Sequence, residues 1–274
     1  MGGSDQLAII EVLGLGWGSL RLRPYVFLFL AIYLTVAVAA WGWRRALAFT
    51  GWAATVALAA EWTSTRIGVP FGLYHYTGET AGRELYLSNV PLFDPLSFTF
   101  LSYASLGLAR QLLGASTPLR LVSLTGLLMM WLDVVIDPLA VRGDRWFLGR
   151  IFYYPEPGWY FGVPVANFVG WVVVGAAIAW GWSLFGDRVG GSPPAWASRL
   201  PARRYHALAL YYLVLAFNLA MTAAVAEPAL FWTGALLHVP LATLVVCSVR
   251  SRAQPGPAPF RAGQARVSAR ERTQ

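Results

Sequence analysis

Long runs of apolar residues, separated by short polar segments, dominate this chain. A helix needs about 20 mostly apolar residues to cross a hydrocarbon core ~30 Å thick, and seven windows of the sequence meet that standard. They cover residues 24–43, 46–65, 91–113, 119–138, 164–185, 206–226 and 228–249. The pattern therefore predicts an all-α fold, a polytopic membrane bundle of about seven transmembrane helices.

The two ends of the chain depart from this pattern. The first apolar stretch, residues 7–17, is interrupted by glycines and is too short to span a membrane, so residues 1–23 are predicted to be an interfacial segment. Residues 251–274 are rich in Pro, Gly, Gln and Arg and predict a disordered basic tail. Residues 24–250 are expected to form a single transmembrane domain.

The arginines predict how the bundle is oriented, because basic residues are retained on the cytoplasmic side of a membrane. If the N-terminus is outside, the inner segments hold 14 of the 21 arginines and the outer segments hold 7. We therefore expect a multi-pass protein of the cytoplasmic membrane, with its N-terminus outside and its C-terminus in the cytoplasm.

Two long outer loops carry an unusual density of Gly, Pro and aromatic residues. They cover residues 66–90 and 140–163. Alternation over residues 73–77 and 85–89, around two glycines, predicts a short outer β-hairpin. Loops of this length and chemistry commonly act as lids or binding surfaces, so we expect them to cover a site.

Composition narrows the chemistry that the chain can perform. Only 12% of its 274 residues are charged, which is typical of a membrane domain, and none of its 21 basic residues is Lys, which excludes amine catalysis. The single Cys247 excludes a disulfide or a CxxC site. The three histidines are too scattered for a histidine box or a zinc centre, so we expect no metal.

Carboxyl groups inside the apolar windows are the candidates for function, because a charged side chain there costs roughly 2.5–3.5 kcal/mol. Glu61, Asp94, Asp133 and Asp137 all fall near outer helix ends, together with Asn167. Alternation of the spans places them in one membrane layer, whichever side is the cytoplasm. We therefore expect these five side chains to share a site.

Structural roles compete with this hypothesis. Asp94 could cap a helix that has Pro95 in its first turn, and Glu61 could pair with Arg66 at the interface. Asp133 and Asp137 are four residues apart, so they share a helical face on which like charges repel. At least one of the two is then protonated, as a proton donor would be, or is paired with Arg142 or Arg145.

Several motifs together resemble one known family. They are EWTSTRIGVPFGLYHY at 61–76, NVP from Asn89, DVVIDPLA at 133–140, Trp146, and GWYFGVPVANFVGW at 158–171. These stretches resemble the CruF family of integral-membrane carotenoid hydratases, which includes γ-carotene 1′,2′-hydratases and bisanhydrobacterioruberin hydratases. The likeness covers roughly residues 25–245, and it departs at Phe161, where a second Tyr is expected.

The resemblance implies cofactor-free addition of water across the terminal C1′,C2′ double bond of an acyclic ψ-end carotenoid, such as γ-carotene or lycopene. We expect Asp137 or Asp133 to be the acid, with its partner or Glu61 stabilising it and orienting water, and with Asp94 in the same acidic set. Asn167 and Asn89 are expected to hold that water. Arg66 and Arg145 are candidates for stabilising the conjugate base. The expected walls of the substrate site are Phe71, Tyr74, Tyr76, Trp131, Trp146, Trp159, Tyr160 and Trp171.

The partners expected from this resemblance are a carotenoid substrate and membrane lipid, with no nucleic acid, and association with other carotenoid-pathway enzymes is allowed. Two alternatives stay open. A membrane ψ-end cyclase also begins by protonating an acyclic end but gives a product of unchanged mass. A non-catalytic carotenoid or lipid carrier would retain pigment without altering it.

Overall fold

The structure of the chain, a computed structural model, describes residues 3–253. Most of the predicted disordered tail, residues 254–274, lies outside this range. Eight helices make up most of the described chain, namely α1 Gly3–Leu22, α2 Pro24–Trp41, α3 Trp43–Ile67, α4 Phe93–Leu113, α5 Pro118–Ala140, α6 Val165–Phe185, α7 His206–Ala224 and α8 Pro228–Ala253. Four short 3-10 turns join some of them, η1 Gly143–Arg145, η2 Gly186–Arg188, η3 Ala195–Arg199 and η4 Arg203–Tyr205.

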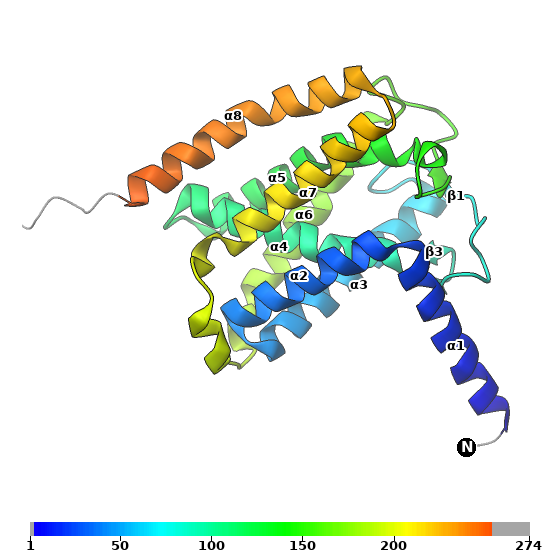
Figure 1. The fold of residues 1–274 in the computed structure, drawn as a ribbon, viewed down its shortest axis with the longest axis horizontal. Coiled ribbons are helices and arrows are strands. Elements are labelled where there is room, and N and C mark those ends of the chain that lie inside the picture. Colours follow the sequence, from blue (N-terminus) through cyan, green and yellow to red (C-terminus); the bar gives the residue numbers. More distant parts are fainter. Residues whose placement is uncertain (1–2, 254–274) are drawn as a thin grey trace, which may run out of the picture.

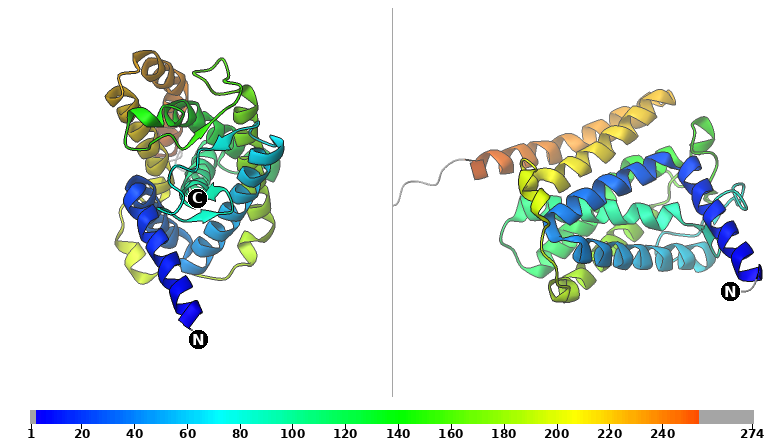
Figure 2. Two further views of the ribbon diagram at one scale, coloured as in Figure 1. Left: turned by 90° about the vertical axis from the view of Figure 1, so that its right-hand side faces the viewer. Right: turned by 60° about the horizontal axis from the view of Figure 1, so that its bottom comes forward.

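The helices from α2 to α8 run lengthwise in one bundle, whereas α1 leaves it at a steep angle (Figures 1 and 2). Five of them, α2, α5, α6, α7 and α8, are long and apolar enough to cross a membrane. The expectation of an all-α membrane protein is thus confirmed. α1 is a continuous helix of 20 residues, so the broken apolar stretch at its centre does not interrupt it.

Local sequence explains where individual helices begin and end. α5 begins after Thr117, whose hydroxyl accepts a hydrogen bond from the Arg120 N–H at 3.4 Å, and Pro118 occupies its first turn. α3 ends at Gly68, which adopts the left-handed conformation (φ +73°) that glycine tolerates best. This ending directs the chain into the first long loop.

Helix α4 lies at the centre of the bundle and packs against α2, α3, α5 and α7. The most extensive helix pair is α5 with α6, where Gly126 and Gly175 face each other. A Cβ atom on Gly175 would lie only 3.0 Å from the Gly126 Cα, so the two backbones approach closely because neither residue has a side chain. This contact holds α5 and α6 side by side, so that the last turns of α5, which carry Asp133 and Asp137, lie next to the first turn of α6, which carries Asn167.

The predicted hairpin is wrong in its pairing. β1 (His75–Tyr76) pairs antiparallel with β4 (Phe152–Tyr153) from the other long loop, and β2 (Tyr86–Leu87) pairs with β3 (Val90–Pro91). The Thr77 N–H extends the first pairing by donating to the Ile151 carbonyl at 2.7 Å. The physical reason is that two-residue strands carry little pattern of their own, so the contact between loops decides their partner. The two long loops are therefore tied to each other.

One end of the bundle gathers both long loops and the α7–α8 turn, and we call it the loop end. The strands and the start of α2 lie there in Figure 1, and α1 passes across it in Figure 2. Arg145 of the second long loop forms an ion pair with Glu227 of the α7–α8 turn. At the opposite end, Arg45 pairs with Asp187 at 2.8 Å. The alternation of helices that the sequence analysis relied on is thus present.

Candidate active site

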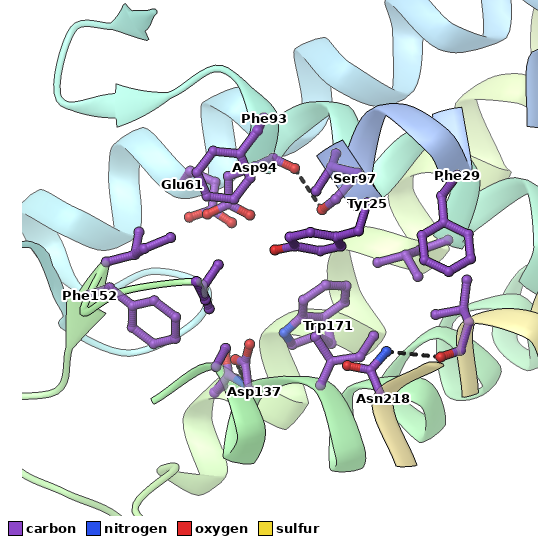
Figure 3. Close-up of a pocket in the computed structure, with 18 of the residues that line it drawn as sticks. Tyr25, Phe29, Glu61, Phe93, Asp94, Ser97, Asp137, Phe152, Trp171 and Asn218 are labelled. Carbon is purple, nitrogen blue, oxygen red and sulfur yellow. Dashed lines mark hydrogen bonds between the residues drawn. The ribbon is translucent and has the colours of Figure 1, made fainter. Parts of the chain in front are cut away.

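A cavity of ≈ 120 Å³ lies inside the bundle near the loop end. Its walls come from α2 to α7 and from both long loops, and 11 of the 24 lining residues are aromatic. The aromatic residues that line it are Tyr25, Phe29, Phe71, Tyr74, Phe93, Phe100, Trp146, Phe152, Tyr154, Trp171 and Phe217. Figure 3 shows the carboxyl groups of Glu61 and Asp94 together on one side of this space and Asp137 on another.

The first pair of carboxyls is joined by a phenol. The Tyr76 hydroxyl lies 2.9 Å from Glu61 Oε2 and is also hydrogen-bonded to Asp94 Oδ2. Burial, and after it the neighbouring Asp94 and Glu61, raises the pKa of Tyr76 well above its usual value, so the phenol keeps its proton. Because a phenol has one proton, it can donate to only one carboxylate at a time. Both hydrogen bonds of Tyr76 can therefore form at once only when one of the two carboxyls carries a proton and donates it to the phenol oxygen.

The second pair of carboxyls is joined by an amide. Asn167 Nδ2 donates to Asp133 Oδ2 at 2.8 Å and to Asp137 Oδ2 at 2.7 Å. The Tyr154 hydroxyl also donates to Asp137 Oδ2, at 3.3 Å, and burial together with the nearby aspartates raises the pKa of Tyr154 well above its usual value. The predicted meeting of Asn167 with the two aspartates is thus present in the structure.

The two aspartates differ in their access to the cavity. Asp137 and Asn167 line it, whereas Asp133 is fully buried and is not part of its wall. Asp133 Oδ1 has no hydrogen-bond partner among residues 3–253. Only Asp137 of this pair can therefore touch a molecule in the cavity, and Asp133 acts on it through Asn167.

The arginines near the loop end are engaged elsewhere. Arg66 donates to Asn89 Oδ1 at 2.7 Å and to Ser88 Oγ at 3.2 Å, and Arg145 pairs with Glu227. Arg142 also pairs with Glu227, at 3.1 Å. In the part of the chain that the structure describes, none of the four site carboxyls takes part in an ion pair. Because none of the four buried carboxyls forms an ion pair with a basic side chain of the described residues, they cannot all be ionised, so the site holds protons.

The structural roles that competed with function are thereby corrected. α4 begins after Leu92, so Asp94 lies inside the first turn and does not cap the helix. Glu61 bonds to Tyr76 rather than to Arg66, and the aspartates bond to Asn167 and Tyr154 rather than to arginines. We accordingly give Arg66 and Arg145 no part in stabilising a conjugate base.

The other predicted residues divide into two groups. Phe71, Tyr74, Trp146 and Trp171 line the cavity, and Tyr76 reaches its acids. The remaining four are not in its lining. Asn89 bonds to Arg66 and Thr65, the Trp131 indole donates to the Leu237 carbonyl, Trp159 is 82% exposed, and the Tyr160 hydroxyl donates to the Val134 carbonyl.

Sequence reasoning missed several residues of the site. Tyr154 lies in the second long loop beside motifs that had been singled out, so its position in YYPEPG offered a signal. Tyr25, Phe29 and Phe217 lie within apolar spans, where an aromatic residue at a helical position is indistinguishable from core. Asn218 is a buried amide that lines the cavity, and its Nδ2 donates to the Val214 carbonyl of its own helix at 2.9 Å.

Comparison with known proteins identifies the family. The family described as carotenoid biosynthesis protein matches residues 23–245, which is most of the chain. The chain belongs to this family. This membership confirms the resemblance found in the sequence, and the matched range contains the cavity and all four carboxyls.

A curated relative of this carotenoid biosynthesis protein is the bisanhydrobacterioruberin hydratase of Haloarcula japonica. The two are 34% identical over 133 residues, which is 47% of this chain and 42% of the relative. The alignment thus spans less than half of the length of that relative. No solved structure matches the chain.

Proposed function

We propose that this protein adds water across the terminal C1′,C2′ double bond of an acyclic ψ-end carotenoid and gives a tertiary 1′-hydroxy product. The observation that carries the proposal is an aromatic cavity with carboxyl groups on two sides. Within residues 3–253, none of these carboxyl groups forms an ion pair with a basic side chain. The hydratase named among its relatives supports the reaction type. An isolated alkene is a weak base, so its hydration begins with a positioned acid.

Asp137 is the acid in this proposal, because it lines the cavity and Asp133 does not. It gives its proton to C2′ and becomes a carboxylate that accepts hydrogen bonds from Asn167 and Tyr154. These two donors are already in place before the charge develops, which is the arrangement that lowers a barrier electrostatically. Asp133 positions Asn167 for this task.

Protonation leaves a cation at C1′ that the conjugated chain cannot reach, so nearby rings must stabilise it. A ring face attracts a cation by ~0.5–2 kcal/mol, and by more when water is excluded. Trp171 is held firmly for this purpose, because it stacks on Phe98 with the ring centroids 4.4 Å apart and the planes 5° from parallel. Water then bonds to C1′ and releases a proton to Glu61 or Asp94. Return of that proton to Asp137 completes the cycle, with one water added and no net proton consumed.

The size of the cavity supports binding of one end of a carotenoid rather than the whole molecule. An apolar cavity of about 150 Å³ holds one benzene molecule. A space of ≈ 120 Å³ therefore suits a branched five-carbon end with little room to spare. The rest of the polyene would lie outside this space, along the apolar bundle or in lipid.

We also propose that α3 and α4 cross the membrane, which gives seven spans. Both are long enough, with 25 and 21 residues, and both pack inside the bundle. They are less apolar than the other five because they carry Glu61 and Asp94 of the site and arginines at their ends. The arginine excess of 14 to 7 then places the N-terminus outside. In this arrangement α1 lies at the interface, where its exposed Ile10, Leu13 and Trp17 would meet lipid.

The test is to express the protein in cells that accumulate γ-carotene or lycopene and to search the extract for a product heavier by one water. Asp137→Asn should abolish that product. A product of unchanged mass would instead identify a cyclase. Pigment that copurifies without any change would identify a carrier.

A further inference from the structure

A second cavity, of ≈ 340 Å³, lies at the loop end between α1 and the first long loop. We call it the vestibule. Small and polar residues contribute much of its wall, among them Ala81, Glu84, Ser88 and Asn89. Figure 1 places α1 and the neighbouring strands at this end of the bundle, away from the middle of the helices. The vestibule therefore lies on the side of the site where the long loops meet water.

Tyr76 links the vestibule to the reaction cavity. Tyr76 lines the vestibule, and its hydroxyl bonds to Glu61 and Asp94, both of which line the reaction cavity. The Tyr76 hydroxyl thus contacts two acids of the reaction cavity, while Tyr76 also borders the vestibule. The phenol can give its proton to one carboxyl while it receives a proton from the other.

The vestibule has the properties of a space that holds water. Glu84, which lines it, is 1% exposed and bonds to Arg23 through Oε1 at 3.0 Å. Its Oε2 is buried and has no hydrogen-bond partner among the described residues. The Glu84 side chain is 0% exposed, so its carboxylate lies behind the wall of the vestibule. Other lining residues, among them Gly78, Ala81 and Ser88, are exposed, so solvent reaches this space, and the space is large enough for several water molecules.

Building on the proposed hydration, we propose that the vestibule supplies the water that the reaction consumes, and that Tyr76 is the point at which water and protons pass to the reaction cavity. Each turnover uses one water, and the walls of the reaction cavity are mostly aromatic and apolar. In this arrangement water enters beside Tyr76 and bonds to C1′, and its released proton is taken by Glu61 or Asp94. Tyr76 relays the proton between these two acids as it starts back toward Asp137, so charge and atoms balance.

Chemical blocking of the vestibule tests the proposal. Cys247 is the single cysteine of the chain, so Cys247→Ser gives a background in which one introduced thiol can be modified alone. In that background Ala81→Cys places a thiol in the vestibule wall, and a charged methanethiosulfonate reagent should then lower hydration by roughly tenfold or more. A thiol reductant should restore the rate.

The matched control is Glu79→Cys in the same background. Residue 79 lies two positions away in the same loop, is exposed and is not part of the vestibule wall. Its modification should leave hydration unchanged. The unlabelled Ala81→Cys protein serves as its own reference for folding and activity.

A second variant tests the relay itself. Tyr76→Phe keeps the ring and removes the hydroxyl, so the carotenoid affinity should hold while turnover falls and its solvent deuterium isotope effect rises. A merely structural role for the hydroxyl would not raise the isotope effect. If unmodified protein forms no water adduct, the proposed function fails. If hydration persists after complete labelling of Ala81→Cys, the vestibule proposal is overturned and the hydratase stands.

Discussion

Asn167 offers the sharpest single test of the site, because one amide group serves two carboxyls. Asn167→Leu keeps the approximate volume and removes the N–H bonds of 2.8 and 2.7 Å to Asp133 and Asp137. A hydrogen bond to a charged group contributes about 1.5–3 kcal/mol, and each 1.36 kcal/mol changes a rate tenfold. Only the bond to Asp137 strengthens as that residue gives up its proton. Turnover should therefore fall roughly 10- to 150-fold.

The assay is the initial rate of formation of the water adduct by purified protein, with carotenoid affinity measured separately. Asn218→Leu is the matched control, because Asn218 lines the same cavity but donates to the Val214 carbonyl of its own helix. The control should keep its turnover within a few-fold of the native protein. Equal losses in both variants would refute the assignment, and so would an Asn167→Leu protein of nearly native rate.

Three further predictions concern stability and pH. Arg23→Met leaves Glu84 as a buried charge without its partner and should lower the free energy of unfolding by about 3–5 kcal/mol in detergent, whereas Arg23→Met with Glu84→Gln should recover part of that loss. Gly126→Ala should lower the melting temperature, since its Cβ would lie 2.4 Å from the Val172 carbonyl oxygen, while Gly51→Ala, with open space around it, should not. Burial is the largest single effect on the pKa of Glu227 and raises it, but the hydrogen bonds and charges of Arg142 and Arg145 together outweigh burial and lower the pKa. The contribution of Glu227 to stability is therefore present above the ordinary value of 4.5 and is lost as pH falls through the lowered pKa. Hydrogen exchange in the α7–α8 turn should rise in that range, and Glu227→Gln should remove this pH dependence.

The membrane helices could be predicted from sequence because a hydrocarbon core imposes one demand, a long apolar run, on every span. The same alternation placed Glu61, Asp94 and Asp137 at one end, and they meet there. The spacing of Asp133 and Asp137 also predicted a shared helical face, which the bridge through Asn167 uses.

Other features depend on contacts between distant segments and leave no local pattern. The pairing of Tyr76 with Phe152 joins two loops whose strands are only two residues long, so the alternation around Gly78 pointed to the wrong partner. Trp159 and Trp171 belong to one motif and are both indoles, yet one is 82% exposed and the other is buried in the site. Whether a ring faces the cavity is decided by the packing of α6, not by its residue type.

The pairing of β1 with β4 has a consequence for the order in which the molecule assembles. A chain that inserts from its N-terminus completes α3 and α4, and with them Glu61 and Asp94, before α5 delivers Asp137. Tyr76 finds its strand partner only when Phe152 has emerged, and Asn167 follows still later on α6. The nascent protein therefore carries half of its acids without an enclosed chamber. The site is complete only after the second loop has docked on the first and α6 and α7 have added Asn167 and Phe217.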